Sequence, residues 1–312
     1  MEELLFDEIE HRYYDNSGIT YTSVTTLIGE YTNTYDVEFW AMYTALKEHG
    51  YRVKPEPSKR SIYCNNVLYK LEKLLLDNTH RHWYAEIRAR WDGLTAEACD
   101  RGNFIHNDLE DNINLSKRDV GGRTNSLISS TKGKRTISTQ HDLDLTNFKE
   151  KYPIVYARLS GYISRGFSIF AEKKVHLPEF GIAGMIDVPL LLGDNFAILD
   201  WKSNKNELHK TAGYYKKINV AGRWIKSTEW IETGERFKYP LDMLEASKFN
   251  IYALQLSAYS RIMEYWGFKP LKNHLEIIHF PLGEEPLLIK IPYLRDEVDI
   301  MFAHFKHNSF KN

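Results

Sequence analysis

Two apolar runs separated by one polar turn constrain the fold of this chain more than any other feature. The runs GIAGMIDVPLLL and NFAILDWK flank Gly193-Asp194, a dipeptide that favours a two-residue hairpin turn. With the turn at this position, Leu192 faces Asn195, and the same register places Asp187 directly opposite Asp200. Directly opposed residues have Cβ atoms about 4.5–5.5 Å apart, so we expect the two carboxylates to be neighbours.

Two like charges facing each other between apolar flanks need a counter-charge. The period of two along a strand puts Lys202 on the same face as Asp200, but one lysine does not obviously satisfy both carboxylates. A divalent cation such as Mg²⁺ or Mn²⁺ would do so. The alternative is a solvated Asp200–Lys202 pair at a sheet edge. Pro189, inside the first strand, is typical of an edge or a bulge, and a bulge would shift the register.

The composition is that of a globular chain without a strong charge bias. Of its 312 residues, 43% are hydrophobic and 27% are charged, and the formal net charge is −1, so nucleic-acid affinity has to come from local patches. Cys64 and Cys99 are too few for a disulfide framework, a four-cysteine zinc site or an iron–sulfur cluster. The start MEELLFDEIE is acidic rather than signal-like, and no stretch approaches the roughly 18 apolar residues of a membrane span. We therefore expect an intracellular chain that does not enter a membrane.

Periodicity predicts the elements on either side of the hairpin. Before it we expect a short hairpin in HRYYDNSGITYT, followed by a helix capped near Thr25. We expect mostly helical structure over 39–94, broken at 54–57. Two further helices over 96–112 and 146–165 and a strand in SIFAEKKVHL complete this part. After it we expect a helix over 246–265, strands at 274–280 and 287–291, and a closing helix from Arg295.

The organisation along the chain favours a single domain over residues 1–312. We divide it into an N-terminal hairpin and helical region (1–95), a core (96–292) and a C-terminal helix (293–312). The polar stretch near 113–140 and the basic stretch near 203–240 are interpreted as insertions. There is no internal repeat and no sharp shift in composition to mark a boundary.

Three motifs in a fixed order resemble those of a nuclease superfamily. Asp187, twelve intervening residues and then Asp200-Trp201-Lys202 resemble the PD-(D/E)xK signature. GNFIH at 102–106 is similar to the GxxxH motif of the RecB-like branch, and QLSAY at 255–259 is similar to its QxxxY motif. The ordered set covers about half of the chain. Ile186 stands where the proline that names the superfamily would be, a departure that is common in this branch.

The resemblance implies a fold and a set of site residues. The fold is α/β: a restriction-endonuclease-like core with a central mixed sheet flanked by helices, here with an N-terminal helical region and insertions. The implied ligands of Mg²⁺ or Mn²⁺ are His106, Asp187, Asp200 and the backbone carbonyl of Trp201. Lys202 becomes the catalytic lysine, and Gln255 and Tyr259 complete the catalytic set. With two cysteines the chain resembles the cluster-free members, such as the mitochondrial genome maintenance and phage-type exonucleases.

The supporting residues also have structural interpretations. His106 lies four residues before Glu110, so the two can form a surface pair on one helix face. Tyr259 belongs to an apolar stripe that is typical of a helix packed on a core. Glu172, in the strand before the hairpin, is a further metal-ligand candidate or a partner of a ligand.

Basic residues after the hairpin are candidates for DNA contact, because lysines track phosphates while aromatic rings stack on unpaired bases. The alternative is a solvated loop with a few packed rings. The candidates are Lys205, Lys210, Lys216, Lys217, Arg223 and Trp224.

The resemblance implies a metal-dependent DNA exonuclease acting on single-stranded or end-exposed DNA in recombination, repair or replication. DNA is the expected partner, with a protein partner or a homo-oligomer as a further option, and the expected location is the cytoplasm and nucleoid of a bacterial or phage-infected cell. Two alternatives stay open: a structure-specific or restriction-like endonuclease, and a catalytically silent nucleic-acid-binding assembly protein. A P-loop phosphotransferase is excluded because no Gly-x-x-x-x-Gly-Lys-Ser/Thr motif occurs.

Overall fold

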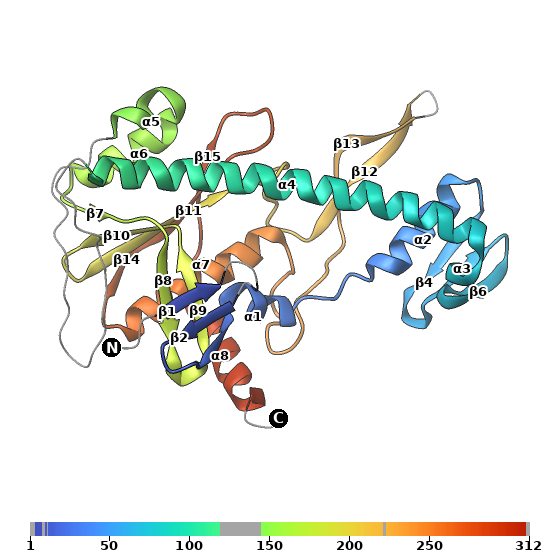
Figure 1. Cartoon of the computed structure of the whole chain (residues 1–312), viewed down its shortest axis with the longest axis horizontal. Helices are drawn as coiled ribbons and strands as arrows, with labels where there is room; N and C mark the ends of the chain where they lie inside the picture. Colours follow the sequence, from blue (N-terminus) through green and yellow to red (C-terminus); the bar gives the residue numbers. More distant parts are fainter. Residues whose placement is uncertain (1–3, 8–9, 11, 119–144, 221–222, 310–312) are drawn as a thin grey trace. The chain divides into compact units, whose positions relative to one another are not determined.

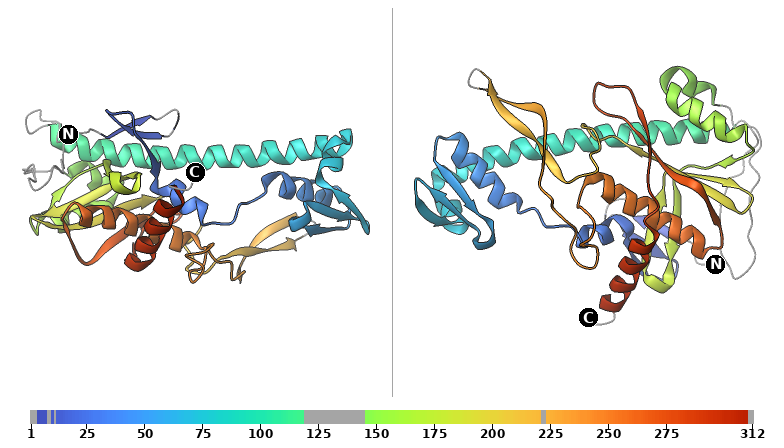
Figure 2. Two further views of the ribbon diagram at one scale, coloured as in Figure 1. Left: turned by 90° about the horizontal axis from the view of Figure 1, so that it is seen from below. Right: turned by 180° about the vertical axis from the view of Figure 1, so that it is seen from behind.

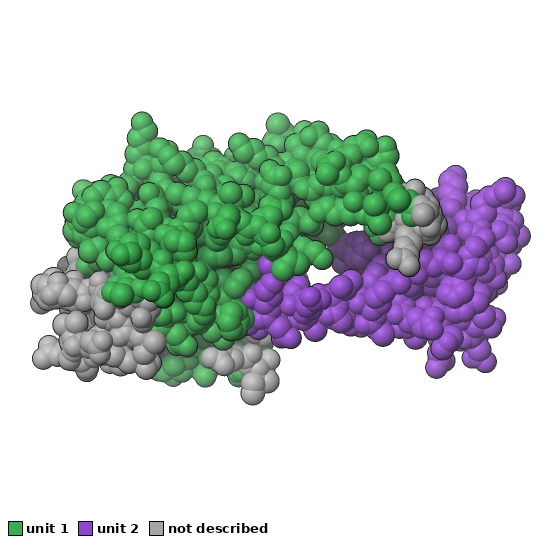
Figure 3. All heavy atoms as spheres, turned by 90° about the horizontal axis from the view of Figure 1, so that it is seen from above, with its two compact units in different colours: residues 1–33, 104–312 green, residues 34–103 purple. Residues whose placement is uncertain are grey.

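The computed structural model describes residues 4–7, 10, 12–118, 145–220 and 223–309 (Figure 1). The chain divides into two compact units, one formed by residues 1–33 and 104–312 and the other by residues 34–103 (Figure 3). Helix α4 (Asn78–Arg118) contributes residues to both units. The insertion expected near 113–140 lies outside the described residues beyond Arg118, where α4 ends.

The smaller unit contains a sheet that the sequence did not lead us to expect. Residues 39–94 are mostly helical, as expected, but the interruption is longer than residues 54–57: β4 (Val53–Glu56), β5 (Ser61–Cys64) and β6 (Val67–Lys70) form an antiparallel sheet. The hairpin between β5 and β6 is made by Asn65 and Asn66, which both have positive φ, of 51° and 70°. Asparagine tolerates this left-handed conformation, which a two-residue hairpin turn requires at both positions. The other elements are α2 (Val37–Glu48), η1 (Pro57–Lys59) and α3 (Leu71–Leu76).

Helix α4 also corrects an expected boundary. We expected a break between a helix ending near residue 94 and a second helix over 96–112, but α4 is one helix of 41 residues. Leu94, Ala96 and Glu97 have high helix propensity, and no proline interrupts the helix there. The opposite correction applies to 146–165, where Pro153 starts a new helix and divides the segment into α5 (Thr146–Lys151) and α6 (Pro153–Ile163).

The larger unit contains two five-stranded sheets, each with parallel and antiparallel pairs. The coarse α/β class is therefore confirmed, although the expected single central sheet is replaced by two. The first sheet has the order β1 (Leu4–Asp7), β2 (Arg12–Asp15), β3 (Thr20–Ser23), β9 (Ile182–Ile186), β8 (Lys173–Leu177). The second has the order β15 (Leu287–Lys290), β14 (Lys269–His279), β11 (Asn195–Lys202), β10 (Val188–Leu192), β7 (Ser168–Ile169).

Two of the expected strands cross from one sheet to the other. SIFAEKKVHL forms β7 in the second sheet and β8 in the first, and GIAGMIDVPLLL forms β9 in the first and β10 in the second. The crossings lie side by side, since the backbone N–H of Glu172 donates to the carbonyl oxygen of Asp187 at 2.9 Å. Each crossing therefore brings one carboxylate to the junction of the sheets.

Two apolar clusters cover the faces of the second sheet. Figure 2 shows α7 (Lys248–Tyr265), in orange, beside the strands of the larger unit. Helix α7 contacts β8, β9, β11 and β14, and so packs on both sheets. Phe196 and Ile198 of β11 belong to the cluster that contains α7, whereas Leu199 and Trp201 belong to the cluster that contains α6. Asp200 and Lys202 continue the alternation and lie on the face covered by α7.

The remaining elements agree with the expectation or refine it. The N-terminal hairpin β2–β3 leads into α1 (Val24–Glu30), with Ser23 as its N-cap. The closing helix is α8 (Arg295–Ser309), and η2 (Pro178–Phe180) joins β8 to β9. The basic stretch 203–240 contains an antiparallel ribbon of β12 (Gly213–Val220) and β13 (Arg223–Glu232).

Candidate metal and phosphate site

The hairpin has the predicted register, and it places the two aspartates at the end of the ladder. Pairs run from Leu192↔Asn195 to Val188↔Leu199, so Asp187 comes directly after the last pair on one strand and Asp200 on the other. Pro189 shifts nothing, because the neighbouring strand β7 pairs only with Leu190 and Leu191.

A backbone hydrogen bond fixes the carboxylate of Asp187. The N–H of Trp201 donates to its Oδ2 at 2.9 Å, across the open end of the hairpin. Trp201 itself is 1% exposed and anchors β11 in the cluster that contains α6. The carboxylate therefore has its direction set by a rigid strand rather than by solvent.

Asp200 and Lys202 form a buried ion pair on the face covered by α7. The Asp200 side chain is 1% exposed, and its Oδ2 is paired with the ammonium of Lys202. That ammonium also lies 4.8 Å from the ring centroid of Tyr252, a cation–π contact from α7. The pair is thus not the solvated edge pair of the alternative interpretation, because Lys202 is only 13% exposed as well.

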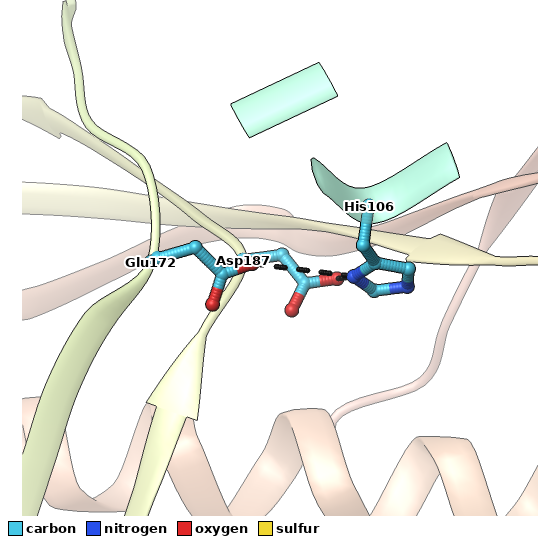
Figure 4. A group of neighbouring side chains, drawn as sticks. All are labelled: His106, Glu172 and Asp187. Carbon is cyan, nitrogen blue, oxygen red and sulfur yellow. Dashed lines mark ion pairs between the residues drawn. The ribbon is translucent and has the colours of Figure 1, made fainter. Parts of the chain in front are cut away.

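Three side chains from three separate elements meet at the sheet junction (Figure 4). One ligand atom from each of His106, Glu172 and Asp187 lies within 4.8 Å of the others. Nδ1 of His106 is 3.6 Å from Oδ2 of Asp187 and 4.0 Å from Oε1 of Glu172. His106 comes from α4, and Glu172 and Asp187 come from the two strand crossings.

The structure brings three of the expected ligands together. Glu172 joins His106 and Asp187, while the carboxylate of Asp200 is paired with Lys202, and the ligand role expected for Asp200 stays a prediction. Glu172 has a φ of 47°, a left-handed conformation that is uncommon for a residue other than glycine and typical of functional sites. The ligand role expected for the carbonyl of Trp201 stays a prediction.

Burial and mutual repulsion disfavour the charged forms of the carboxylates. Burial raises the pKa of Asp187, against the opposing charges of His106 and Lys202. Burial, followed by the charge of Asp187, raises the pKa of Asp200 to about 7, although Lys202 acts in the other direction. A cation bound between these groups would favour their charged forms, because opposite charge lowers a carboxyl pKa.

For His106 the surroundings favour the charged form. Burial lowers its pKa, but the neighbouring carboxylate of Glu172 and the charges of Asp187 and Asp200 outweigh burial and raise the pKa to about 9. His106 acts in this arrangement as a counter-charge for the carboxylates, so a metal ion that binds its Nδ1 has to displace a proton.

Helix α7 brings the QxxxY pair against the same junction. The amide Nε2 of Gln255 donates to the hydroxyl of Tyr259 at 3.1 Å, and Tyr259 is 4% exposed. Its ring covers Gly184 of β9 so closely that a Cβ on Gly184 would lie 2.5 Å from Cε1 of the ring. Burial raises the pKa of Tyr259, and the charges of Asp200 and Asp187 raise it further. Tyr259 is therefore both a core residue and a neighbour of the acidic site.

Tyr13 is a site residue that the sequence interpretation missed. Burial raises its pKa to about 12, and the charges of Glu172 and Asp187 add to the effect. Tyr13 lies in β2, two strands away from β9 in the first sheet. The alternation in HRYY indicates one inward-facing tyrosine, but only the order of the strands places that residue beside the carboxylates.

The expected DNA-contact residues are distributed over the β12–β13 region. Lys205 and Lys217 line a pocket, the ammonium of Lys216 is 2.8 Å from Oε2 of Glu229, and that of Lys210 lies 5.6 Å from the ring centroid of Phe249. Arg223 and Trp224 belong to β13, and their side chains lie outside the described part of the structure.

The comparisons with known proteins found no relative of this chain. No family model, curated protein or solved structure matches it. Among the described residues, no helix combines the length and apolar character needed to cross a membrane.

Proposed function

We propose that this chain is a divalent-metal-dependent deoxyribonuclease that hydrolyses phosphodiester bonds and acts as an exonuclease. The observation that carries the proposal is the convergence of His106, Glu172 and Asp187, with ligand atoms within 4.8 Å of one another, beside the buried Asp200–Lys202 pair. The ordered resemblance to the RecB-like branch supplies the choice of DNA, of exonuclease action and of a restriction-endonuclease-like core.

The donor set fits Mg²⁺ or Mn²⁺. Carboxylate oxygens are the ligands that these hard cations prefer, and an imidazole nitrogen is compatible with Mn²⁺ in particular. Glu172 and Asp187 are neighbouring carboxylates that repel each other when both are charged. Among the described residues, both form ion pairs with His106 rather than with a lysine or an arginine. When bound, the metal would supply a more acidic water and neutralise charge on the phosphate.

The protein groups have separable roles. His106, Glu172 and Asp187 would hold the cation, with the direction of Asp187 fixed by the N–H of Trp201. Lys202 would face the phosphate, where its ammonium orients the attacking water or offsets charge on the phosphoryl oxygens. Asp200 keeps Lys202 charged, because the charge of Asp200 opposes burial and raises the pKa of that lysine.

A digestion time course on linear DNA tests the proposal. Linear duplex and single-stranded DNA, labelled separately at the 5′ and 3′ ends, is incubated with Mg²⁺ or Mn²⁺, and a covalently closed circle serves as the endonuclease control. We expect progressive shortening from one end, loss of activity with a chelator and an intact circle. Cutting of the circle would convert the proposal to an endonuclease. Inert linear DNA in the presence of folded, metal-bound protein would refute nuclease activity.

A further inference from the structure

A pocket of about 700 Å³ lies between the β12–β13 ribbon and the start of α7. This volume falls within the range of small-molecule sites. Its lining mixes lysines with aromatic rings, and two carboxylates, Glu207 and Glu235, also line it. The lysines are Lys205, Lys217, Lys226 and Lys248, and the rings are His209, Tyr214, Tyr215 and Trp230.

The aromatic wall is held by contacts among its own members. The ring of His209 stacks on Trp230, with centroids 3.8 Å apart and an interplanar angle of 15°. Tyr215 meets both rings edge-on, and its hydroxyl is 2.8 Å from Nε2 of His209. The indole N–H of Trp230 donates to Oγ1 of Thr211 at 3.1 Å. A wall that is ordered before a ligand arrives loses little entropy on binding.

Tyr214 has a different environment from that wall. Tyr214 is one of the residues that line the pocket, and it is 57% exposed. Exposed aromatic rings are what single-strand-binding proteins use for unpaired bases, because every base has a π-face to stack.

The charges of the pocket favour an anionic ligand. Four lysines outnumber the two carboxylates of the lining. The pocket also includes Ser247, the N-cap of the 18-residue helix α7, and Lys248, its first residue, where the helix dipole is positive. A phosphate group would therefore meet favourable charge from both the ribbon and the helix.

The pocket is connected to Lys202 through Asn204 and Tyr252. Asn204 lines it and accepts a hydrogen bond through Oδ1 from the hydroxyl of Tyr252 at 2.6 Å. The ring of Tyr252 in turn lies 4.8 Å from the ammonium of Lys202. Asn204 follows Lys202 by two residues, and two residues of extended chain span at most about 7 Å. The part of the pocket formed by Asn204 therefore lies close to the proposed reaction centre.

We propose that this pocket binds one unpaired nucleotide of a DNA single strand, with its base against the aromatic rings and its phosphate among the lysines. The inference rests on the proposed nuclease function and deepens it, since it makes a single-stranded end the substrate. A paired base in a blunt duplex could not enter such a pocket without being unpaired and unstacked, which is unfavourable.

Binding measured without metal tests the pocket separately from cleavage. Fluorescence anisotropy in a chelator compares a labelled oligothymidylate with a blunt duplex of equal length. We expect the whole protein to bind the single strand at least tenfold more tightly than the duplex. Tyr214→Ala should weaken single-strand binding about tenfold, whereas Tyr214→Phe, which keeps the ring, should restore it. Equal affinity for the duplex would overturn the inference.

A strand with abasic positions provides a double-mutant cycle for the stacking contact. Wild-type protein should bind the abasic strand about as weakly as Tyr214→Ala binds the normal strand, and the variant should lose no further affinity. Lys217→Ala should weaken binding and reduce the salt dependence by about 0.7 in log–log slope, the amount for one phosphate contact on a single strand. Lys290→Ala is the charge-matched control, because Lys290 is exposed on β15 and is not among the residues that line the pocket.

The two proposals fail in distinguishable ways. Tight single-strand binding that depends on Tyr214 and Lys217, without any metal-dependent cleavage, would support the pocket and refute the nuclease. Cleavage by wild-type protein, together with unchanged binding by the Tyr214→Ala and Lys217→Ala variants, would overturn the pocket and leave the nuclease intact.

Discussion

The backbone N–H of Trp201 donates to Oδ2 of Asp187 at 2.9 Å, and the same Oδ2 lies 3.6 Å from Nδ1 of His106. One carboxylate oxygen is thus shared between a rigid strand and a helix side chain. This makes Asp187 the residue whose charge can be removed with the least change of structure, because an asparagine oxygen can still accept the Trp201 hydrogen bond.

Asp187→Asn should abolish metal binding while leaving the metal-free fold intact. In a chelator we expect its melting temperature to equal or exceed that of wild type, since the substitution relieves repulsion from Glu172 and Asp200. The thermal shift caused by Mn²⁺ should disappear, and cleavage should fall at least about 100-fold. Differential scanning fluorimetry with and without Mn²⁺ measures the first two quantities. Asp194→Asn, at the far turn of the hairpin, is the matched control and should retain the shift.

Lys202→Ala should separate phosphate chemistry from metal binding. We expect cleavage to fall about 100- to 1000-fold while the Mn²⁺-induced thermal shift persists. The metal-free variant should lose roughly 3–5 kcal/mol of stability, because Asp200 is left buried without its partner.

A second substitution tests that explanation. The double variant Lys202→Ala/Asp200→Asn should be more stable to urea than Lys202→Ala alone in a chelator. A double variant that is less stable would contradict the assignment of the loss to an uncompensated charge.

Gly184→Ala should destabilise the packing between β9 and α7. An added Cβ would lie 2.5 Å from Cε1 of Tyr259, so the ring and the helix have to shift. We expect a loss of about 1–3 kcal/mol in urea unfolding, with weaker metal binding because Tyr259 neighbours the carboxylates. Gly29→Ala, on an exposed position of α1 with nothing within 4 Å of the new Cβ, should instead be neutral or stabilising by up to about 1 kcal/mol.

His274 should make stability dependent on pH in a defined window. Burial lowers its pKa from 6.5 to about 4 in the folded protein. Between these values the unfolded chain binds a proton at this position and the folded protein does not, so this contribution to stability is complete above pH 6.5 and is lost as the pH falls toward 4.

Comparison with His274→Gln isolates the effect. A glutamine amide can replace Nε2 of His274, which lies 2.7 Å from Oγ of Ser260. The difference in melting temperature between wild type and variant should change steadily from pH 6.5 to 4. A constant difference across this window would show that the imidazole does not titrate as described.

Local patterns were sufficient for the hairpin and for the helices that end on clear signals. The turn at Gly193-Asp194 and the alternation on both sides determine the β10–β11 register, and the pattern around Ala246 to Tyr265 predicts α7 within about two residues. The apolar run through Asp187 gave no sign of the sheet crossing, because the residues on both sides are equally apolar. The turn at Asn65 and Asn66, which adopt the left-handed conformation that asparagine tolerates, was not identified from the sequence.

The hairpin register was predictable because it depends on short spacing, and it selects Asp187, Asp200 and Lys202 as candidates. His106 is a candidate only through the resemblance of the ordered motifs. The proximity of Glu172 to Asp187 depends on two crossings that are 15 residues apart and joined by one hydrogen bond. The position of Tyr13 depends on the parallel pairing of β3 with β9. Long-range pairings of this kind leave no periodic trace in a single sequence.

The single-residue crossing at Asp187 also limits how the length of this chain can vary. Strand β9 ends at Ile186 and β10 begins at Val188, so each residue from Ile182 to Leu192 belongs either to a strand or to the one-residue crossing. One insertion there would reverse the inward and outward faces of a strand or move the carboxylate away from the Trp201 N–H. Length changes that preserve the chemistry should therefore accumulate at the hairpin turn and in the β12–β13 ribbon, and a deletion scan would find this eleven-residue window intolerant at every position.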